Sequence, residues 1–190
     1  MKEGDLDKLL SFMMEAIKIK EEKRTGFAIA GVKDPEHVGD HSFSTALLAY
    51  ALAPAVHLSP DKCLRMALVH DVHEAITGDI PSHYGNATKE KRRIEYKDSM
   101  KMLSYLGSSN KSIRAILLEF LEGRSKEARF VHEVDKLDYV IQLTRSQKYM
   151  KAASVRKFLI SGDIGIHTQE LRYIYEKVRS QVYKERHWKR

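Results

Sequence analysis

Residues 67–79, with the sequence ALVHDVHEAITGD, contain a His-Asp doublet late in a stretch with helical periodicity. We expect this helix to begin after Ser59, because serine caps helices and the proline that follows suits the first helical position. Its expected end is Gly78. Residues four apart lie on one face of a helix, so His70 and Glu74 should point the same way. An imidazole and a carboxylate from consecutive residues are good ligands for a divalent metal ion.

Helical periodicity also dominates the rest of the chain, where alternating strand patterns are at most a few residues long. A first helix should run to about Lys23, and a second helix should start at Asp34-Pro35. Between them, two glycines and the proline should prevent a regular helix over 24–35. Residues 79–88 should form a loop. Further helices are expected at about 88–106, 110–122, 126–148 and 168–186. The sequence therefore predicts an all-α fold, with a single domain over residues 1–190 and about six to seven helices.

The composition is that of an ordinary soluble domain, with 190 residues, 43% hydrophobic and 31% charged. The single cysteine, Cys63, excludes a disulfide within the chain and is typical of a reducing compartment. The sequence has no apolar run long enough to span a bilayer, and its N-terminus lacks the apolar region of a signal peptide. We therefore expect a cytoplasmic protein with no membrane partner.

The net charge of +7 is compatible with nucleic-acid binding and with attraction of a small phosphorylated substrate. Basic residues stand beside acidic ones, as in KEKRRIEYKD at 89–98, and form no long basic arm. The charge by itself therefore does not decide between these two classes of function.

Two more residues of metal-binding type lie on other predicted helices. His41 belongs to an apolar stripe, which should direct it inward, and Asp135 lies beside the apolar stripe of its own helix. Burying such groups without partners costs several kcal/mol, and metal coordination is one way to remove that penalty. For Asp135, a charge cluster with Lys136 and Asp138 explains the pattern equally well.

As a set, these residues resemble the pattern of the HD-domain metal-dependent phosphohydrolases, which is a histidine, a His-Asp pair and a late aspartate on separate helices. The matching residues are His41, His70, Asp71 and Asp135. The resemblance is closest to the HD-domain 5'-deoxynucleotidases, which hydrolyse deoxyribonucleoside 5'-monophosphates. RTGF at 24–27 is similar to the Arg-x-Gly-Trp segment of that branch, and HDVHEAITGD at 70–79 is similar to its HDxxExxxGD segment.

The resemblance implies that those four residues hold one divalent cation, such as manganese, cobalt or zinc. It also implies catalytic roles for Glu74 and Asp79. Arg24 should clamp the substrate phosphate, because a guanidinium matches two phosphate oxygens at once, and Lys89 is a further candidate for that phosphate. Phe27 stands where the branch has a tryptophan expected to lie against the sugar. Phenylalanine keeps an aromatic face but lacks the indole N–H.

The expected substrate is a nucleoside 5'-monophosphate. Because relatives of this size usually associate, we also expect a homodimer. One alternative is another HD-type nucleotide hydrolase, acting on a cyclic nucleotide, a nucleoside triphosphate or a guanosine alarmone. RTGF and the modest chain length argue against it. The other alternative is a non-enzymatic, helical nucleic-acid-binding protein. Against it, all four expected ligands are present, and basic and aromatic residues do not form a groove-like pattern.

Overall fold

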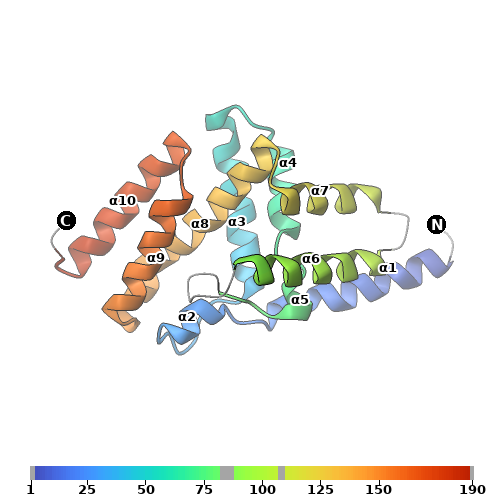
Figure 1. The fold of residues 1–190 in the computed structure, drawn as a ribbon, viewed down its shortest axis with the longest axis horizontal. Coiled ribbons are helices and arrows are strands. Elements are labelled where there is room, and N and C mark those ends of the chain that lie inside the picture. Colours follow the sequence, from blue (N-terminus) through green and yellow to red (C-terminus); the bar gives the residue numbers. More distant parts are fainter. Residues whose placement is uncertain (1–2, 82–87, 107–109, 189–190) are drawn as a thin grey trace.

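The computed structural model describes residues 3–81, 88–106 and 110–188, which are almost entirely helical (Figure 1). Within these ranges the only β-type pairing is an isolated bridge between Lys23 and His37, so the predicted all-α class is confirmed. Eight α-helices in the described ranges have ten or more residues and two are shorter, which exceeds the expected number. No helix in these ranges combines the length and the apolar character needed to cross a membrane. The helices are α1 (Glu3–Ala16), α2 (Thr25–Ile29), α3 (Val38–Leu52), α4 (Pro60–Val69), α5 (Glu74–Thr77), α6 (Thr88–Tyr105), α7 (Lys111–Glu122), α8 (Lys126–Ser146), α9 (Ala152–Gly165) and α10 (Gln169–Glu185).

The N-terminal segment is more broken than its sequence predicts. Helix α1 ends at Ala16, and the 3-10 turn η1 (Ile17–Lys20) follows it, so the first helix is shorter than expected. The segment expected to be irregular begins with the short helix α2. A carboxylate distant in sequence explains this helix, because Asp79 Oδ2 accepts the Thr25 N–H at 2.6 Å. Such a capping group cannot be read from local periodicity.

The start of α3 also differs from the prediction, because the helix begins at Val38 and not at the Asp34-Pro35 signal. The residues just before it pair with the chain around Arg24. The Arg24 N–H donates to the Glu36 carbonyl at 3.0 Å, and the Val38 N–H donates to the Glu22 carbonyl at 2.8 Å. Because the backbone before Val38 is paired with the chain around Arg24, α3 begins only at Val38.

Helix α4 starts as predicted but ends early. Ser59 Oγ accepts the Lys62 N–H at 3.4 Å, which caps the helix. The helix stops at Val69, and residues 70–73 form a turn before α5. Gly78, with φ of 70°, follows the last residue of α5 as its C-cap. Within the turn, hydrogen bonds such as Glu74 N–H to the Asp71 carbonyl at 2.9 Å link residues three apart. The His-Asp doublet therefore lies in a turn between two helices and not inside one helix.

In the C-terminal half, α6, α7, α8 and α10 follow the predicted ranges closely, whereas α9 was not expected. Most of the loop predicted at 79–88, residues 82–87, lies outside the described residues. The glycines of α9 suggest a connection, yet Gly162 lies inside the helix and is buried. A Cβ at this position would lie 2.5 Å from Cε2 of Tyr175. Gly162 therefore allows α9 and α10 to approach closely.

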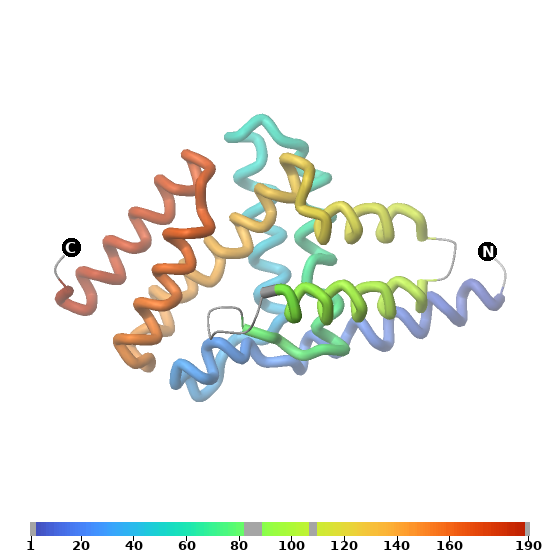
Figure 2. The backbone as a smooth tube through the Cα atoms, in the orientation of Figure 1, coloured from blue at the N-terminus to red at the C-terminus, as the bar shows by residue number. Residues whose placement is uncertain are grey.

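The His-Asp turn lies where two apolar clusters adjoin. Figures 1 and 2 show α3, α4 and α8 in the centre, with α9 and α10 on one side and α1, α6 and α7 on the other. The larger cluster includes Met66 and Ala67 of α4 and extends to α10. The smaller cluster includes Val72 and joins the turn to α6 and α7. The chain thus passes from the larger cluster, in which α4 packs, to the smaller cluster at Val72.

Gly162→Ala should destabilise the protein by about 1–3 kcal/mol, because the added methyl group overpacks the interface with Tyr175. The matched control is Gly4→Ala in α1, where a Cβ meets nothing within 4 Å. That change should stabilise by up to about 1 kcal/mol, since alanine favours helices over glycine. Urea denaturation measures both values. Equal gains in stability for the two variants would contradict the proposed role of Gly162.

Candidate metal centre

The four predicted ligand residues come from three parts of the chain and meet in the core. His41 lies on α3, His70 and Asp71 lie in the turn after α4, and Asp135 lies on α8. Asp71 Oδ2 is 3.1 Å from Nε2 of His70 and 3.6 Å from Nε2 of His41. Asp135 Oδ1 is 3.1 Å from Nε2 of His41. Ligand-type atoms of His41, His70 and Asp71 all lie within 4.8 Å of one another.

Both histidines turn an unpaired nitrogen toward this cluster. His41 and His70 are 0% and 1% exposed, and their Nε2 atoms have no hydrogen-bond partner among the described residues. Each Nδ1 is already engaged, at 2.7 Å from the Ala67 carbonyl for His70 and 2.6 Å from Asp138 for His41. Burying unpaired nitrogens is costly, and a cation between Nε2 atoms and carboxylates removes that cost. The cluster therefore fits a divalent metal ion.

The charges of the cluster are strongly coupled. Burial opposes ionisation of Asp71, but His70, His41 and Arg24 hold the pKa of this carboxyl well below its usual range. Burial and Arg24 oppose the charge of His41, whereas the adjacent carboxylates of Asp135 and Asp138 raise its pKa to about 9. A cation that binds Nε2 must displace this proton, so cation binding should release protons.

Glu74 at the start of α5 behaves differently from Asp71. Its side chain is buried, and burial together with the neighbouring Asp71 and Asp79 raises its pKa well above the ordinary value. One carboxyl of the site is thus ionised while another tends to keep its proton. Opposite shifts in neighbouring carboxyl groups are typical of sites that perform acid-base chemistry.

Arg24 extends the site toward its edge. Its Nη1 lies 3.7 Å from Asp71 Oδ2 and 3.6 Å from Asp79 Oδ1. Burial opposes its charge, but Asp79, Glu74 and Asp71 raise the pKa of the guanidinium above its ordinary value. Asp79 also caps α2 through the Thr25 N–H, so one carboxylate fixes both the helix and the arginine that precedes it. The RTGF segment therefore brings a charged guanidinium beside the His-Asp doublet.

The two other predicted substrate contacts, Phe27 and Lys89, differ in their exposure to solvent. Phe27 is 2% exposed, and its ring centroid is 4.8 Å from that of Phe158 on α9, so it has little free surface. Lys89 is exposed at the start of α6 and takes part in none of the ion pairs of the described residues. The lysine whose charge acts on Glu74 is Lys91. The roles of Phe27 and Lys89 stay predictions.

Two carboxyl groups beside His41 were not expected as site residues. Ligand-type atoms of Glu36, His41 and Asp138 also lie within 4.8 Å of one another. Burial, with Asp138 nearby, raises the pKa of Glu36 to about 7. The spacing of three residues from Asp135 could have indicated Asp138, because both then share a face of α8. Glu36 reaches the site only through the pairing of its backbone with Arg24.

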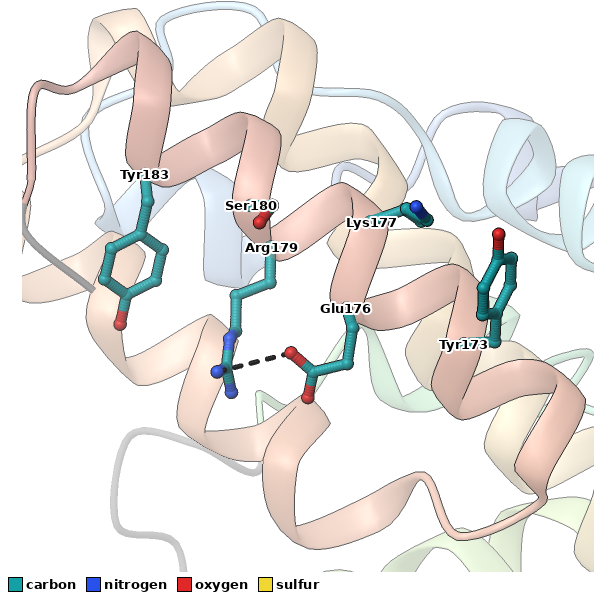
Figure 3. Close-up of a pocket in the computed structure, with 6 residues that line it drawn as sticks. All are labelled: Tyr173, Glu176, Lys177, Arg179, Ser180 and Tyr183. Atoms are coloured by element: carbon teal, nitrogen blue, oxygen red, sulfur yellow. Dashed lines mark ion pairs between the residues drawn. The ribbon is translucent and has the colours of Figure 1, made fainter.

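A separate hollow of about 390 Å³ lies along α10 (Figure 3). It is bordered by polar and aromatic side chains, among which Glu176 Oε2 lies 3.2 Å from Arg179 Nη2. The predicted ligands and catalytic residues do not line it. This hollow is therefore distinct from the candidate metal centre.

The helical fold and the His-Asp cluster are those of an HD-domain protein. The family model described as HD domain matches residues 16–178, and the chain belongs to this family. Within it, the chain is 30% identical to the 5'-deoxynucleotidase HDDC2 of Danio rerio over 169 residues, 87% of this chain and 84% of that protein. It is 28% identical to the 5'-deoxynucleotidase hdd1 of Schizosaccharomyces pombe over 156 residues, 79% of this chain and 78% of that protein. The predicted family resemblance is thereby confirmed.

The fold has the same arrangement in a solved structure. A conserved hypothetical protein from Pyrococcus furiosus matches it with a TM-score of 0.70 at 25% identity, over 90% of this chain and 99% of that chain. The helical arrangement thus extends over nearly the whole length of both proteins.

Proposed function

We propose that this protein is a metal-dependent phosphohydrolase that releases phosphate from nucleoside 5'-monophosphates, with deoxyribonucleotides as the expected substrates. The observation that carries the proposal is the convergence of His41, His70, Asp71 and Asp135, with two buried Nε2 atoms free toward the carboxylates. The names of the relatives in Danio rerio and Schizosaccharomyces pombe support the substrate class. RTGF and the 70–79 segment support the same choice.

The proposed cation ligands are the four residues of this cluster. A mixed set of imidazoles and carboxylates suits manganese, cobalt or zinc. When bound, such a cation supplies neutralisation of phosphate charge and activation of a water molecule for attack on phosphorus. The chain's own residues then have to bind the phosphate and move protons.

Arg24 is the proposed phosphate clamp. Its contacts with Asp71 and Asp79 are 3.6–3.7 Å long, so its N–H donors are not consumed by short hydrogen bonds to these carboxylates. Asp79 is then a residue that holds Arg24 and α2 in place, in addition to its predicted catalytic role. Lys89 and Phe27 are proposed as weaker contacts to phosphate and sugar.

Glu74 is the proposed carrier of the proton. Hydrolysis breaks the bond between phosphorus and the 5'-oxygen, and water supplies the new oxygen on phosphorus. The departing 5'-oxygen needs a proton, and the attacking water loses one. A buried carboxyl group with a raised pKa holds a proton that it can give away and then accepts one from water.

The substrate class can be tested by measuring phosphate release from ribo- and deoxyribonucleoside 5'-monophosphates after chelation and addition of single divalent cations. We expect release only with a cation, and none from Asp71→Ala, whose circular dichroism should stay helical. Preferred hydrolysis of cyclic nucleotides or nucleoside triphosphates would indicate the other HD-type hydrolases. Binding of DNA with a steep salt dependence, but no phosphate release, would support the non-enzymatic alternative.

Glu74→Gln should lower kcat by about 100- to 10,000-fold, since it removes a proton-transfer group of nearly the same shape. Affinity for the cation, measured by calorimetry, should be unchanged because Glu74 is not one of the proposed ligands. Glu176→Gln on α10, which removes a carboxylate from surface ion pairs, is the matched control and should keep full turnover. Unaltered turnover in Glu74→Gln would make Glu74 a structural residue.

A homodimer is proposed through one apolar face of α1 and α3. Each helix has a stripe whose side chains are about half exposed or more, at helical spacing. The stripes are Leu6, Leu10 and Met13 on α1, continued by Ile17 of η1, and Phe43, Leu47 and Tyr50 on α3. A groove of about 720 Å³, lined in part by Lys20 and Asp40, lies between α1 and the start of α3. Two-fold pairing would cover both stripes.

Leu47→Glu should convert this dimer to a monomer, because it buries a charge in the apolar face. Size-exclusion chromatography with light scattering measures the mass. Ile164→Glu is the control, since Ile164 is 70% exposed on α9, outside this face. A monomeric wild-type protein at micromolar concentration would refute the dimer, as would equal dissociation of the two variants.

We also propose that residues 1–190 form one HD domain and that the protein is cytoplasmic, without a stable nucleic-acid partner. The larger apolar cluster supports a single domain, because it includes residues from α2 to α10. The lone Cys63 is a buried free thiol, which suits a reducing compartment.

A further inference from the structure

We propose that Asp138 is a positioning residue that holds His41 with its Nε2 toward the cation. This inference rests on the proposed metal site and adds a residue that is not one of the four expected ligands. Its basis is the short contact between Asp138 Oδ2 and His41 Nδ1, 2.6 Å, on the side of the ring away from the cluster.

The imidazole of His41 lies between two carboxylates of one helix. Asp135 and Asp138 are three residues apart on α8 and therefore share the face that packs against α3. Asp135 Oδ1 approaches Nε2 at 3.1 Å, whereas Asp138 Oδ2 approaches Nδ1. One turn of α8 thus supplies both a proposed ligand and the group behind the ring.

The two carboxylates differ in their access to solvent. The side chain of Asp135 is 26% exposed, whereas that of Asp138 is 7% exposed and His41 is fully buried. Asp135 is therefore on the open side of the cluster and Asp138 is in the core. Because the Asp138 carboxylate is buried, bulk water does not compete with His41 for it. The bond therefore fixes the orientation of the imidazole.

This bond decides which nitrogen can bind a cation. A neutral imidazole has one N–H, and a carboxylate can only accept, so the hydrogen must be on Nδ1. The lone pair of Nε2 then faces Asp71 and Asp135. His70 is held in the same tautomer, but by the Ala67 carbonyl at 2.7 Å. The Nδ1–H of each histidine thus donates to a different kind of acceptor. The acceptor for His41 is a charged carboxylate, whereas the acceptor for His70 is a neutral backbone carbonyl.

Other polar groups near Nδ1 are weaker acceptors for it. Thr45 Oγ1 is 3.4 Å from His41 Nδ1, at the limit of a hydrogen bond. Glu36 is the other carboxyl group in this cluster, and its contact with His41 is not among the hydrogen bonds. Glu36 therefore provides a comparison in which a nearby buried carboxyl is removed without loss of the bond to Nδ1.

The test compares Asp138→Asn with Glu36→Gln in the full-length protein. Both variants replace a buried carboxyl by an amide of similar shape. Cation affinity is measured with Mn²⁺ by calorimetry, and the environment of the bound ion by the visible absorption of the Co²⁺ form. Asp138→Asn should weaken Mn²⁺ binding by about 10- to 100-fold and shift the Co²⁺ bands, because the neutral amide lacks the charge that orients the imidazole and raises its basicity as a ligand. Glu36→Gln should change both much less.

The outcomes separate this inference from the proposed function. If wild type binds neither ion, the metal site itself is wrong. If wild type binds Mn²⁺ and Asp138→Asn binds it equally well with the same Co²⁺ spectrum, the positioning role is refuted. Equal losses in both variants would also refute it, because total charge and not the bond would then control affinity. Thermal unfolding of the cation-free variants checks that the Asp138→Asn protein is folded.

Discussion

The packing of α8 against α3 is the constraint on which the rest of the site depends. It brings Asp135 and Asp138 to opposite nitrogens of His41, at 3.1 and 2.6 Å. A fully buried imidazole is unfavourable unless its nitrogens are satisfied. Helix α8 provides an acceptor for one nitrogen and leaves the other facing carboxylates. The geometry of the centre is thus a consequence of how two helices pack in the core.

The break between α4 and α5 is the second element of this arrangement. A continuous helix would continue the hydrogen-bond pattern of α4, whereas the turn at 70–73 joins residues three apart. His70 keeps its bond to Ala67 within α4, and Glu74 begins the next helix. Helix α4 before this turn packs in the larger apolar cluster, and Val72 within the turn packs in the smaller one. Of the proposed ligands, His70 and Asp71 therefore lie outside regular helix, whereas His41 and Asp135 lie on α3 and α8.

Asp79 connects the N-terminal RTGF segment to the centre. Its carboxylate caps α2 and lies beside Arg24, so the position of the guanidinium depends on a residue more than fifty positions away. The electrostatic result is a buried site that combines ionised and protonated carboxyl groups with one arginine. Such a combination suits the binding of an anionic phosphate followed by transfer of protons.

The sequence by itself determined the helical class and most helix ranges after residue 88, because apolar periodicity is a local property, and through the family resemblance it named the candidate residues of the centre. It could not determine the break after Val69, the start of α3 at Val38 or the helix that contains Gly162. Each depends on a partner distant in sequence: the apolar cluster of α6 and α7 that includes Val72, the pairing near Arg24, and the ring of Tyr175. Glu36 and the bond from His41 to Asp138 likewise exist only after the chain has folded, since tertiary packing brings their atoms together.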